Sequence, residues 1–398
     1  MKFNKWTLGL AAVGVVSLTS AVQADETKMS QVQTALSNTT ISGFVDVSAQ
    51  FNPGGGGGVN NSPNYNLGNN ANQISLNEVQ VSLDKPLDEA PWASGYHVDL
   101  WLGPGAESLG TSPSSASQAA IRQAYIALRT PVGNGIDWKF GVFDTIIGYE
   151  GLTSGNNPNF SHSYGFNIEP TTHTGALAAY KISDEITIQG GVADTSFSGT
   201  AYSAEINGVS ANGNDNGGLS CPTLLGLVSL TAPESWGWAK GGVLSGGIIN
   251  TSGGSTHGAT SYYVGGTLPT PIAKLKFGGS FDYLNVHSGG NTWNVAGYST
   301  YAFNDKLSLN LRAEHLSGTA ALNGGAYFNT TGFANNASDE LTATLQYDIW
   351  ENVLSRLEVR WDHVEHGNGY ASTSTSNSGG IGTESEAWLL AAQLIYTF

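Results

Sequence analysis

The chain has 398 residues, a formal net charge of −16 and only 12% charged residues. Soluble domains typically carry about 25% charged residues, so this composition predicts a surface that faces water only in part. The acidic balance excludes nucleic acid as a partner, because a polyanion needs a basic footprint. The single cysteine, Cys221, excludes an internal disulfide and a cysteine metal site.

The N-terminus has the parts of a secretory signal. A basic start with Lys2 precedes an apolar core over residues 7–18, which is shorter than the roughly 20 residues of a transmembrane helix. Small residues, Val22 and Ala24, stand three positions and one position before the expected cleavage site. We predict a signal peptide over residues 1–24, cut after Ala24, rather than a retained anchor. Residues 25–40 then form a short periplasmic segment.

From Ile41 onward the hydrophobic pattern has period two, which is typical of half-buried strands. In residues 353–361, for example, Arg356, Glu358 and Arg360 alternate with apolar neighbours. We count about sixteen such segments, each roughly the length of a membrane-crossing strand. Their expected cores are residues 41–51, 73–84, 93–102, 120–128, 136–143, 173–181, 186–194, 223–231, 236–248, 258–267, 272–284, 292–303, 306–316, 339–348, 353–363 and 386–398.

The connections between these segments alternate in length. Residues 183–185 and 304–305 are short links, whereas 195–222, 317–338 and 365–385 are long and rich in Gly, Asn, Ser and Thr. Outer-membrane barrels have short periplasmic turns and long extracellular loops. Beyond residue 25 the sequence has no apolar run of transmembrane-helix length, and only a closed barrel otherwise satisfies every backbone group in lipid.

We therefore predict an all-β fold, a transmembrane antiparallel up-and-down β-barrel of about sixteen strands over residues 41–398. A closed barrel of this size leaves an aqueous channel. Phe398 ends the last alternating segment. A terminal aromatic residue there is similar to the membrane-insertion signal of bacterial barrels, so we expect the barrel assembly machinery and outer-membrane lipid or lipopolysaccharide as partners.

Five stretches resemble the β-barrel porin family described as OmpL-like. They are Ile41–Val47, Asn77–Pro86, Ile121–Leu128, Lys139–Glu150 and residues 156–174, of which residues 120–180 carry the most specific part. The resemblance implies a Gram-negative outer-membrane barrel and a channel, and it implies no particular solute.

The link over residues 144–172 is the third long connection and our candidate for a loop that narrows the pore, by analogy with general porins. Long loops in compact folds usually have a function. Its candidate constriction residues are Asp144, Tyr149, Glu150, Tyr164 and Glu169. The alternative is a loop that caps the barrel outside or contacts a neighbouring subunit.

Charged residues on the polar faces of strands are expected to face the lumen, because charge on the lipid face costs about 2–4 kcal/mol at the midplane. By parity these are Glu78, His97, Asp99, Lys274, Lys276, Arg312, Arg356, Glu358 and Arg360. They would either set a transverse field that selects ions or form salt bridges that stiffen the wall. The pattern around Arg122 does not assign that residue to a face.

Aromatic residues near the expected strand ends are interpreted as interfacial girdles, with sugar-stacking residues in the lumen as the alternative. They are Trp92, Trp101, Trp138, Trp236, Trp238, Trp350, Trp361, Trp388 and Tyr396.

The expected function is passive diffusion of ions and small hydrophilic solutes. The sequence has no nucleophile elbow and no zinc-protease motif, so we expect no enzyme, cofactor or metal. Residues 362–366 (DHVEH) are interpreted as polar residues at a strand–loop boundary rather than ligands. The alternatives are an adhesive or structural barrel and, less favoured, a barrel-embedded hydrolase. The size is compatible with a homotrimer.

Overall fold

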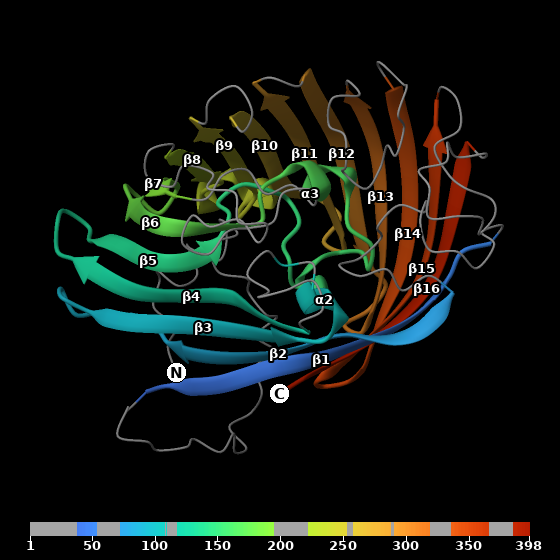
Figure 1. Ribbon diagram of the computed structural model, residues 1–398, viewed down its shortest axis with the longest axis horizontal. Helices are drawn as coiled ribbons and strands as arrows, with labels where there is room; N and C mark the ends of the chain where they lie inside the picture. The colour runs from blue at the N-terminus through green and yellow to red at the C-terminus, as the bar shows by residue number, and fades with distance from the viewer. Residues whose placement is uncertain are drawn as a thin grey trace.

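The computed structural model describes residues 38–53, 72–107, 109, 118–194, 222–252, 258–287, 290–318, 336–365 and 385–398. Within these ranges the chain forms one closed barrel of sixteen antiparallel strands, each bonded to its neighbours in sequence (Figure 1). The strands are β1 Thr40–Phe51, β2 Gln73–Lys85, β3 Ser94–Leu102, β4 Ala119–Thr130, β5 Ile136–Asp144, β6 Thr172–Lys181, β7 Ile186–Ala193, β8 Thr223–Thr231, β9 Val243–Thr251, β10 Ala259–Pro269, β11 Leu275–Val286, β12 Gly290–Ala302, β13 Leu307–Gly318, β14 Asn336–Trp350, β15 Val353–Val364 and β16 Glu386–Thr397.

The barrel closes where the first strand meets the last. β1 and β16 pair antiparallel from Phe44 opposite Thr397 to Phe51 opposite Leu390. Beyond β16, the Phe398 backbone N–H donates to the Gly43 carbonyl oxygen at 2.9 Å, and the Gly43 N–H donates to the Phe398 carbonyl oxygen at 3.0 Å. The predicted fold class is thus confirmed, and no strand edge remains among the sixteen strands that the structure describes.

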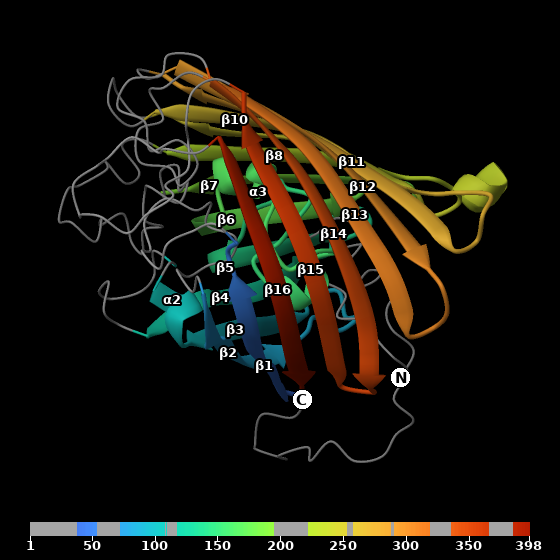
Figure 2. The same cartoon turned by 90° about the vertical axis from the view of Figure 1, so that its right-hand side faces the viewer.

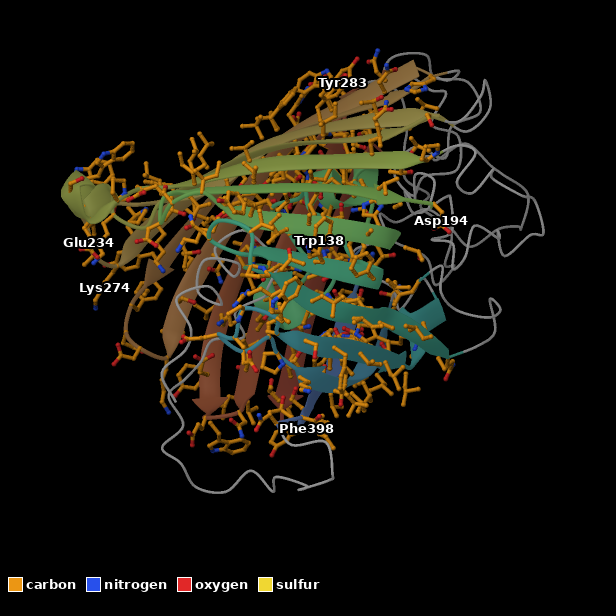
Figure 3. The ribbon with its side chains drawn as sticks, turned by 90° about the vertical axis from the view of Figure 1, so that its left-hand side faces the viewer. Trp138, Asp194, Glu234, Lys274, Tyr283 and Phe398 are labelled. Carbon is orange, nitrogen blue, oxygen red and sulfur yellow. The ribbon has the colours of Figure 1, made fainter. Side chains whose placement is uncertain are left out.

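Each strand separates an apolar outer face from a mostly polar inner one. On β15 the Leu357 side chain is 62% exposed, whereas its neighbours Arg356 and Glu358 are 2% and 5% exposed. The period-two pattern arises because lipid takes the apolar face and the lumen takes the polar face. Figure 3 shows side chains projecting from both sides of the sheet, with Trp138 on β5 among those labelled.

The ninth strand begins well after its predicted start. β9 starts at Val243 instead of residue 236, because Glu234–Ala239 forms the 3-10 segment η3 in the turn before it. Gly237 adopts a φ of 58° inside η3, a backbone conformation that breaks an extended strand. Trp236 and Trp238 therefore lie in an exposed turn rather than on a strand.

The long connection between β5 and β6 lies inside the barrel. It contains a 3-10 turn, η1 Ser154–Asn156, and a short helix, α3 Tyr164–Ile168, all of whose residues are buried. A second short helix, α2 Pro104–Glu107, follows β3. Figures 1 and 2 show α3 enclosed by the ring of strands.

No helix among the described residues is long and apolar enough to cross a membrane. The predicted signal peptide over residues 1–24, most of the segment 25–40, Cys221 and His366 lie outside the described residues.

Candidate functional site

The loop over residues 144–172 reaches the opposite side of the barrel. It leaves from β5 and returns to β6, yet the Glu150 carboxylate accepts a hydrogen bond of 2.8 Å from Nη1 of Arg312 on β13. β5 and β13 are eight positions apart in a closed order of sixteen strands. The loop therefore lies across the bore.

Arg312 is the centre of this contact. Its side chain is fully buried and lies 2.9 Å from Glu314 and 3.1 Å from Glu340, on the same wall. Nη1 also donates to the Ser161 carbonyl oxygen at 2.6 Å, so one guanidinium joins two segments of the loop to the wall. Arginine suits this position because its planar fork holds several acceptors at once.

Two further arginines on β15 bind the loop backbone. Arg360 donates to the His162 carbonyl oxygen at 2.6 Å and pairs with Asp362 at 2.7 Å. Arg356 donates to the Ser154 carbonyl oxygen at 2.9 Å. In the reverse direction, Glu358 accepts the backbone N–H groups of Phe160 and Ser161 at 2.6 and 2.9 Å. These bonds satisfy loop backbone groups that have no strand partner.

Two tyrosines of the loop pack between these charges. Tyr149 stacks on Tyr298 of β12 with ring centroids 4.0 Å apart. Tyr164 is fully buried, and its hydroxyl donates to Asp362 at 2.6 Å and lies 2.9 Å from the Ser338 hydroxyl. The Tyr164 backbone N–H donates to Glu314 at 2.9 Å. The loop and the wall of β12–β15 thus form one continuous polar network.

The start of the loop is held by apolar packing instead. Ile146 and Ile147 join a buried cluster formed by the inner faces of β5–β10, which includes Leu177, Leu225, Leu227, Ile249 and Tyr263. Gly247 on β9 lies under this contact, since a Cβ there would come within 2.6 Å of Ile147 Cγ2.

A second apolar contact joins the loop to the segment after β3. Leu152 and Phe166 pack with Trp101 and with Ala106 of α2. Trp101 is fully buried and its indole N–H donates to Gln80 at 2.7 Å. Its assignment to an interfacial girdle is therefore wrong. It shares the parity of Asp99, which faces the lumen on the same strand.

The two loop carboxyls experience opposite electrostatic surroundings. Burial alone raises the pKa of Glu150, but the Arg312 guanidinium and hydrogen bonds from His162 and Ser163 outweigh it and hold the pKa at about 2. Burial raises the pKa of Glu169 well above its usual range, and the Asp282 carboxyl on β11 beside it raises it further. Glu150 is thus a loop anion, whereas Glu169 favours its protonated form.

The wall of β2–β5 carries a separate chain of charges. His97 lies between Asp84 and Asp99 at 2.9 and 3.0 Å. Arg122 is buried and donates to Asp99 at 2.6 Å and to Asp144 at 2.7 Å. Arg122 had no predicted face because the β3–β4 register shifts between Asp99 and Leu100. This irregularity places Arg122 and Gln123 successively on the inside.

The remaining lumen candidates fall in different places. Glu78 on β2 is buried opposite Asp46 of β1. Lys276 lies on β11 with the parity of Ser280 and Asp282. Lys274 does not lie on the wall: β11 begins only at Leu275, because the Thr270 hydroxyl bonds Ile272 and Leu275 in a tight turn. Its Nζ instead donates to the Phe303 carbonyl oxygen at 2.7 Å, and Figure 3 shows it at the barrel's turn end.

Several wall residues of the network were not among the predicted site residues. Glu314, Glu340 and Asp362 share the inner face with Arg312 and Arg360, and strand parity alone could have identified them. No local pattern points to the loop groups Ser161 and His162, because their partners lie some 150 or more residues away along the chain.

Comparison with known proteins supports the architecture. The model of the family described as "Putative beta-barrel porin-2, OmpL-like" matches residues 38–398. No curated protein matches the sequence. Three solved structures with the same fold each align over 90% of this chain with a TM-score of 0.56.

The first is the outer membrane channel DcaP of Acinetobacter baumannii, at 14% identity over 97% of that chain. The second is an anion-selective porin from Comamonas acidovorans, at 11% identity over 99% of that chain. The third is OmpF of Salmonella typhi in complex with daunomycin, at 13% identity over 97% of that chain. This chain belongs to the OmpL-like β-barrel porin family and is a porin of the bacterial outer membrane.

Proposed function

We propose that the barrel conducts ions and small hydrophilic solutes by passive diffusion, and that the loop over residues 144–172 sets the width of its passage. The observation that carries this proposal is the Glu150–Arg312 ion pair, which joins the loop to a strand half the circumference away. A segment anchored on opposite walls reduces the free cross-section of the bore.

The distribution of charges supports the anchoring role of the three arginines over a role in selecting ions. Arg312, Arg356 and Arg360 are each at most 2% exposed, and their donors are directed at loop carbonyls and wall carboxylates. A group that selects ions must face the water column. The chain of His97, Asp99 and Arg122 on β2–β5 is a better candidate for that role, because His97 is partly exposed.

Single-channel recording tests the proposal. The purified mature barrel is inserted into a planar bilayer under a salt gradient. Discrete, stable conductance steps are expected, and the sign of the reversal potential then gives the charge preference. A correctly folded, heat-modifiable barrel that carries no current would contradict the channel and favour an adhesive or structural barrel.

Three further expectations belong to the same proposal. We infer cleavage after Ala24, which sequencing of the mature N-terminus tests by finding Asp25 first. The size is compatible with a homotrimer, and light scattering of the detergent complex measures the oligomeric state. Phe398 is expected to serve membrane insertion, so Phe398→Ser should lower the yield of folded barrel in the outer membrane.

A further inference from the structure

Three side chains that the channel does not use meet on the outer surface of the barrel. On β13, Arg312 and Glu314 point inward and Leu311 is exposed outside, so His315 shares the outer face with Leu311. The register places His315 opposite Asp339 on β14. Glu365 follows the end of β15, and its backbone N–H donates to the Ala337 carbonyl oxygen of β14 at 2.9 Å.

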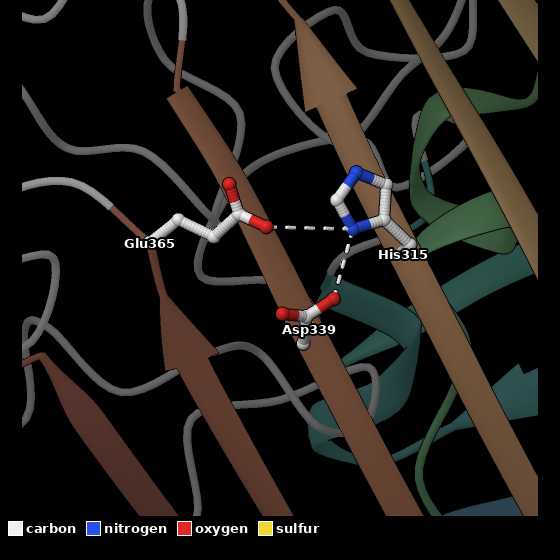
Figure 4. A group of neighbouring side chains, drawn as sticks. All are labelled: His315, Asp339 and Glu365. Carbon is white, nitrogen blue, oxygen red and sulfur yellow. Dashed lines mark hydrogen bonds and ion pairs between the residues drawn. The ribbon is translucent and has the colours of Figure 1, made fainter.

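These residues bring one imidazole and two carboxylates together. Nδ1 of His315 lies 2.8 Å from Oδ1 of Asp339 and 3.9 Å from Oε1 of Glu365 (Figure 4). One ligand atom from each of the three lies within 4.8 Å of the others. Two ligands bound tetrahedrally to Zn²⁺ at about 2.0–2.1 Å lie about 3.4 Å apart, so shifts of roughly half an ångström would bring the two pairs that include His315 to that spacing. The Asp339–Glu365 pair, whose ligand atoms lie within 4.8 Å, would close by about 1.4 Å at most.

The backbone and a neighbouring ring fix the arrangement in advance. Each ligand comes from a different strand end, and ladder hydrogen bonds hold these ends in register. The His315 ring also packs on Trp293 of β12 at a centroid distance of 5.2 Å, which limits its rotation. A preorganised set of one nitrogen and two oxygen ligands suits a borderline cation better than Ca²⁺ or Mg²⁺, which prefer oxygen ligands alone.

We propose that His315, Asp339 and Glu365 form a binding site for a divalent cation of the Zn²⁺ class on the outer rim of the barrel. The cation takes the place of the Nδ1 proton of His315, which leaves to solvent. It joins the ends of β13, β14 and β15 by coordination, in addition to their backbone bonds. Three protein ligands leave at least one position of a tetrahedral ion open to water.

The site lies just beyond the part of the outer face that is apolar and contacts lipid. One step along the outer face toward the periplasmic end, Leu341 of β14, Trp361 of β15 and Trp388 of β16 form a row in register. Aromatic residues mark the membrane–water interface in outer-membrane barrels. The open coordination position therefore faces the aqueous side of that interface, where a metal ion has access.

Zinc titration tests the site directly. The full-length barrel, without an affinity tag and stripped with EDTA, is titrated with ZnCl₂ by calorimetry. One ion per chain should bind, and its binding should raise the melting temperature because the metal binds only the folded rim. His315→Ala and Glu365→Gln should each weaken zinc binding by about tenfold or more.

Two histidine variants serve as matched controls. His287→Ala removes another histidine after a strand end, where Nε2 bonds the Thr260 hydroxyl at 3.0 Å, and should leave zinc binding unchanged. His363→Ala removes the histidine opposite Asp339 on β15 and should also retain it. Heat-modifiable migration verifies that each variant is folded. Equal zinc affinity in the wild type and His315→Ala, or no zinc binding by the wild type, would contradict the site and leave only the His315–Asp339 hydrogen bond.

Discussion

The loop over residues 144–172 meets two walls of the barrel that hold it by different forces. Against β6–β10 the contact is apolar, with Ile146 and Ile147 on leucine and isoleucine side chains. Against β12–β15 it is ionic, with Arg312, Arg356 and Arg360 bound to carboxylates and loop carbonyls.

The two kinds of contact constrain the loop in different ways. Apolar packing is non-directional and follows the area removed from water. Charge-assisted hydrogen bonds fix direction, and removing one partner leaves the other charge buried and uncompensated. The ionic wall should therefore determine the path of the loop, whereas the apolar wall should mainly add stability.

The largest effect is expected from Arg312→Ala. The change leaves Glu150, Glu314 and Glu340 buried without their shared cation, a loss that costs about 3–5 kcal/mol for buried pairs. The loop should leave the wall, and single-channel conductance should rise and become noisier. The control is Arg129→Ala, which breaks the Arg129–Asp137 pair outside the loop network. Unaltered conductance in Arg312→Ala would remove this residue from the anchor.

A smaller effect is expected from Ile147→Ala on the apolar wall. Truncating a buried isoleucine costs about 2 kcal/mol or more, through lost transfer energy and the cavity left behind. The thermal unfolding temperature should fall, while mean conductance should change less than in Arg312→Ala. Equal changes in conductance in the two variants would contradict the claim that the ionic wall determines the path of the loop while the apolar wall mainly adds stability.

The two loop carboxyls should respond to pH in opposite directions. The low pKa of Glu150 means that its contribution is present above its unfolded value of 4.5 and lost as pH falls toward about 2. The pKa of Glu169 is raised, so its stabilising contribution is present below its unfolded value of 4.5 and is lost as pH rises from there through the raised pKa. Over that pH range the loop's return to β6 should loosen. Glu169→Gln should abolish the pH dependence of conductance in that upper range. Recording both proteins across the range measures it, and identical profiles would contradict the assignment.

The smallest effect is expected from Tyr164→Phe. The ring stays, but the hydroxyl bonds to Asp362 and Ser338 are lost, which costs about 1–3 kcal/mol when a charged acceptor is involved. Denaturant or thermal unfolding should show a modest loss of stability with little change in conductance. A conductance change as large as that of Arg312→Ala would mean that the hydroxyl, not the guanidinium, fixes the loop.

Period two and loop lengths were sufficient to predict the sixteen strands, because lipid and lumen impose opposite polarities on alternate residues. Three failures have local causes: a bulge hid the face of Arg122, a 3-10 segment delayed β9, and a turn at Thr270 delayed β11 and took Lys274 off the wall. The partners of Glu150 could not be predicted, since Arg312 is 162 residues away and depends on barrel closure. Likewise, residues 362–366 contained Glu365, but His315 and Asp339 join it only through register.

Thiol labelling at Gly151 tests most directly whether the loop crosses the bore. Gly151 is exposed within the loop, and a Cβ there would meet nothing within 4 Å. In a Cys221→Ser background, Gly151→Cys is treated with a charged thiol reagent during single-channel recording. The control for effects of the reagent outside the bore is Gly297→Cys, on the outer, lipid-facing side of β12. We predict a stepwise change in current for Gly151→Cys and none for Gly297→Cys; an unchanged current at labelled Gly151→Cys would contradict a loop in the conducting path.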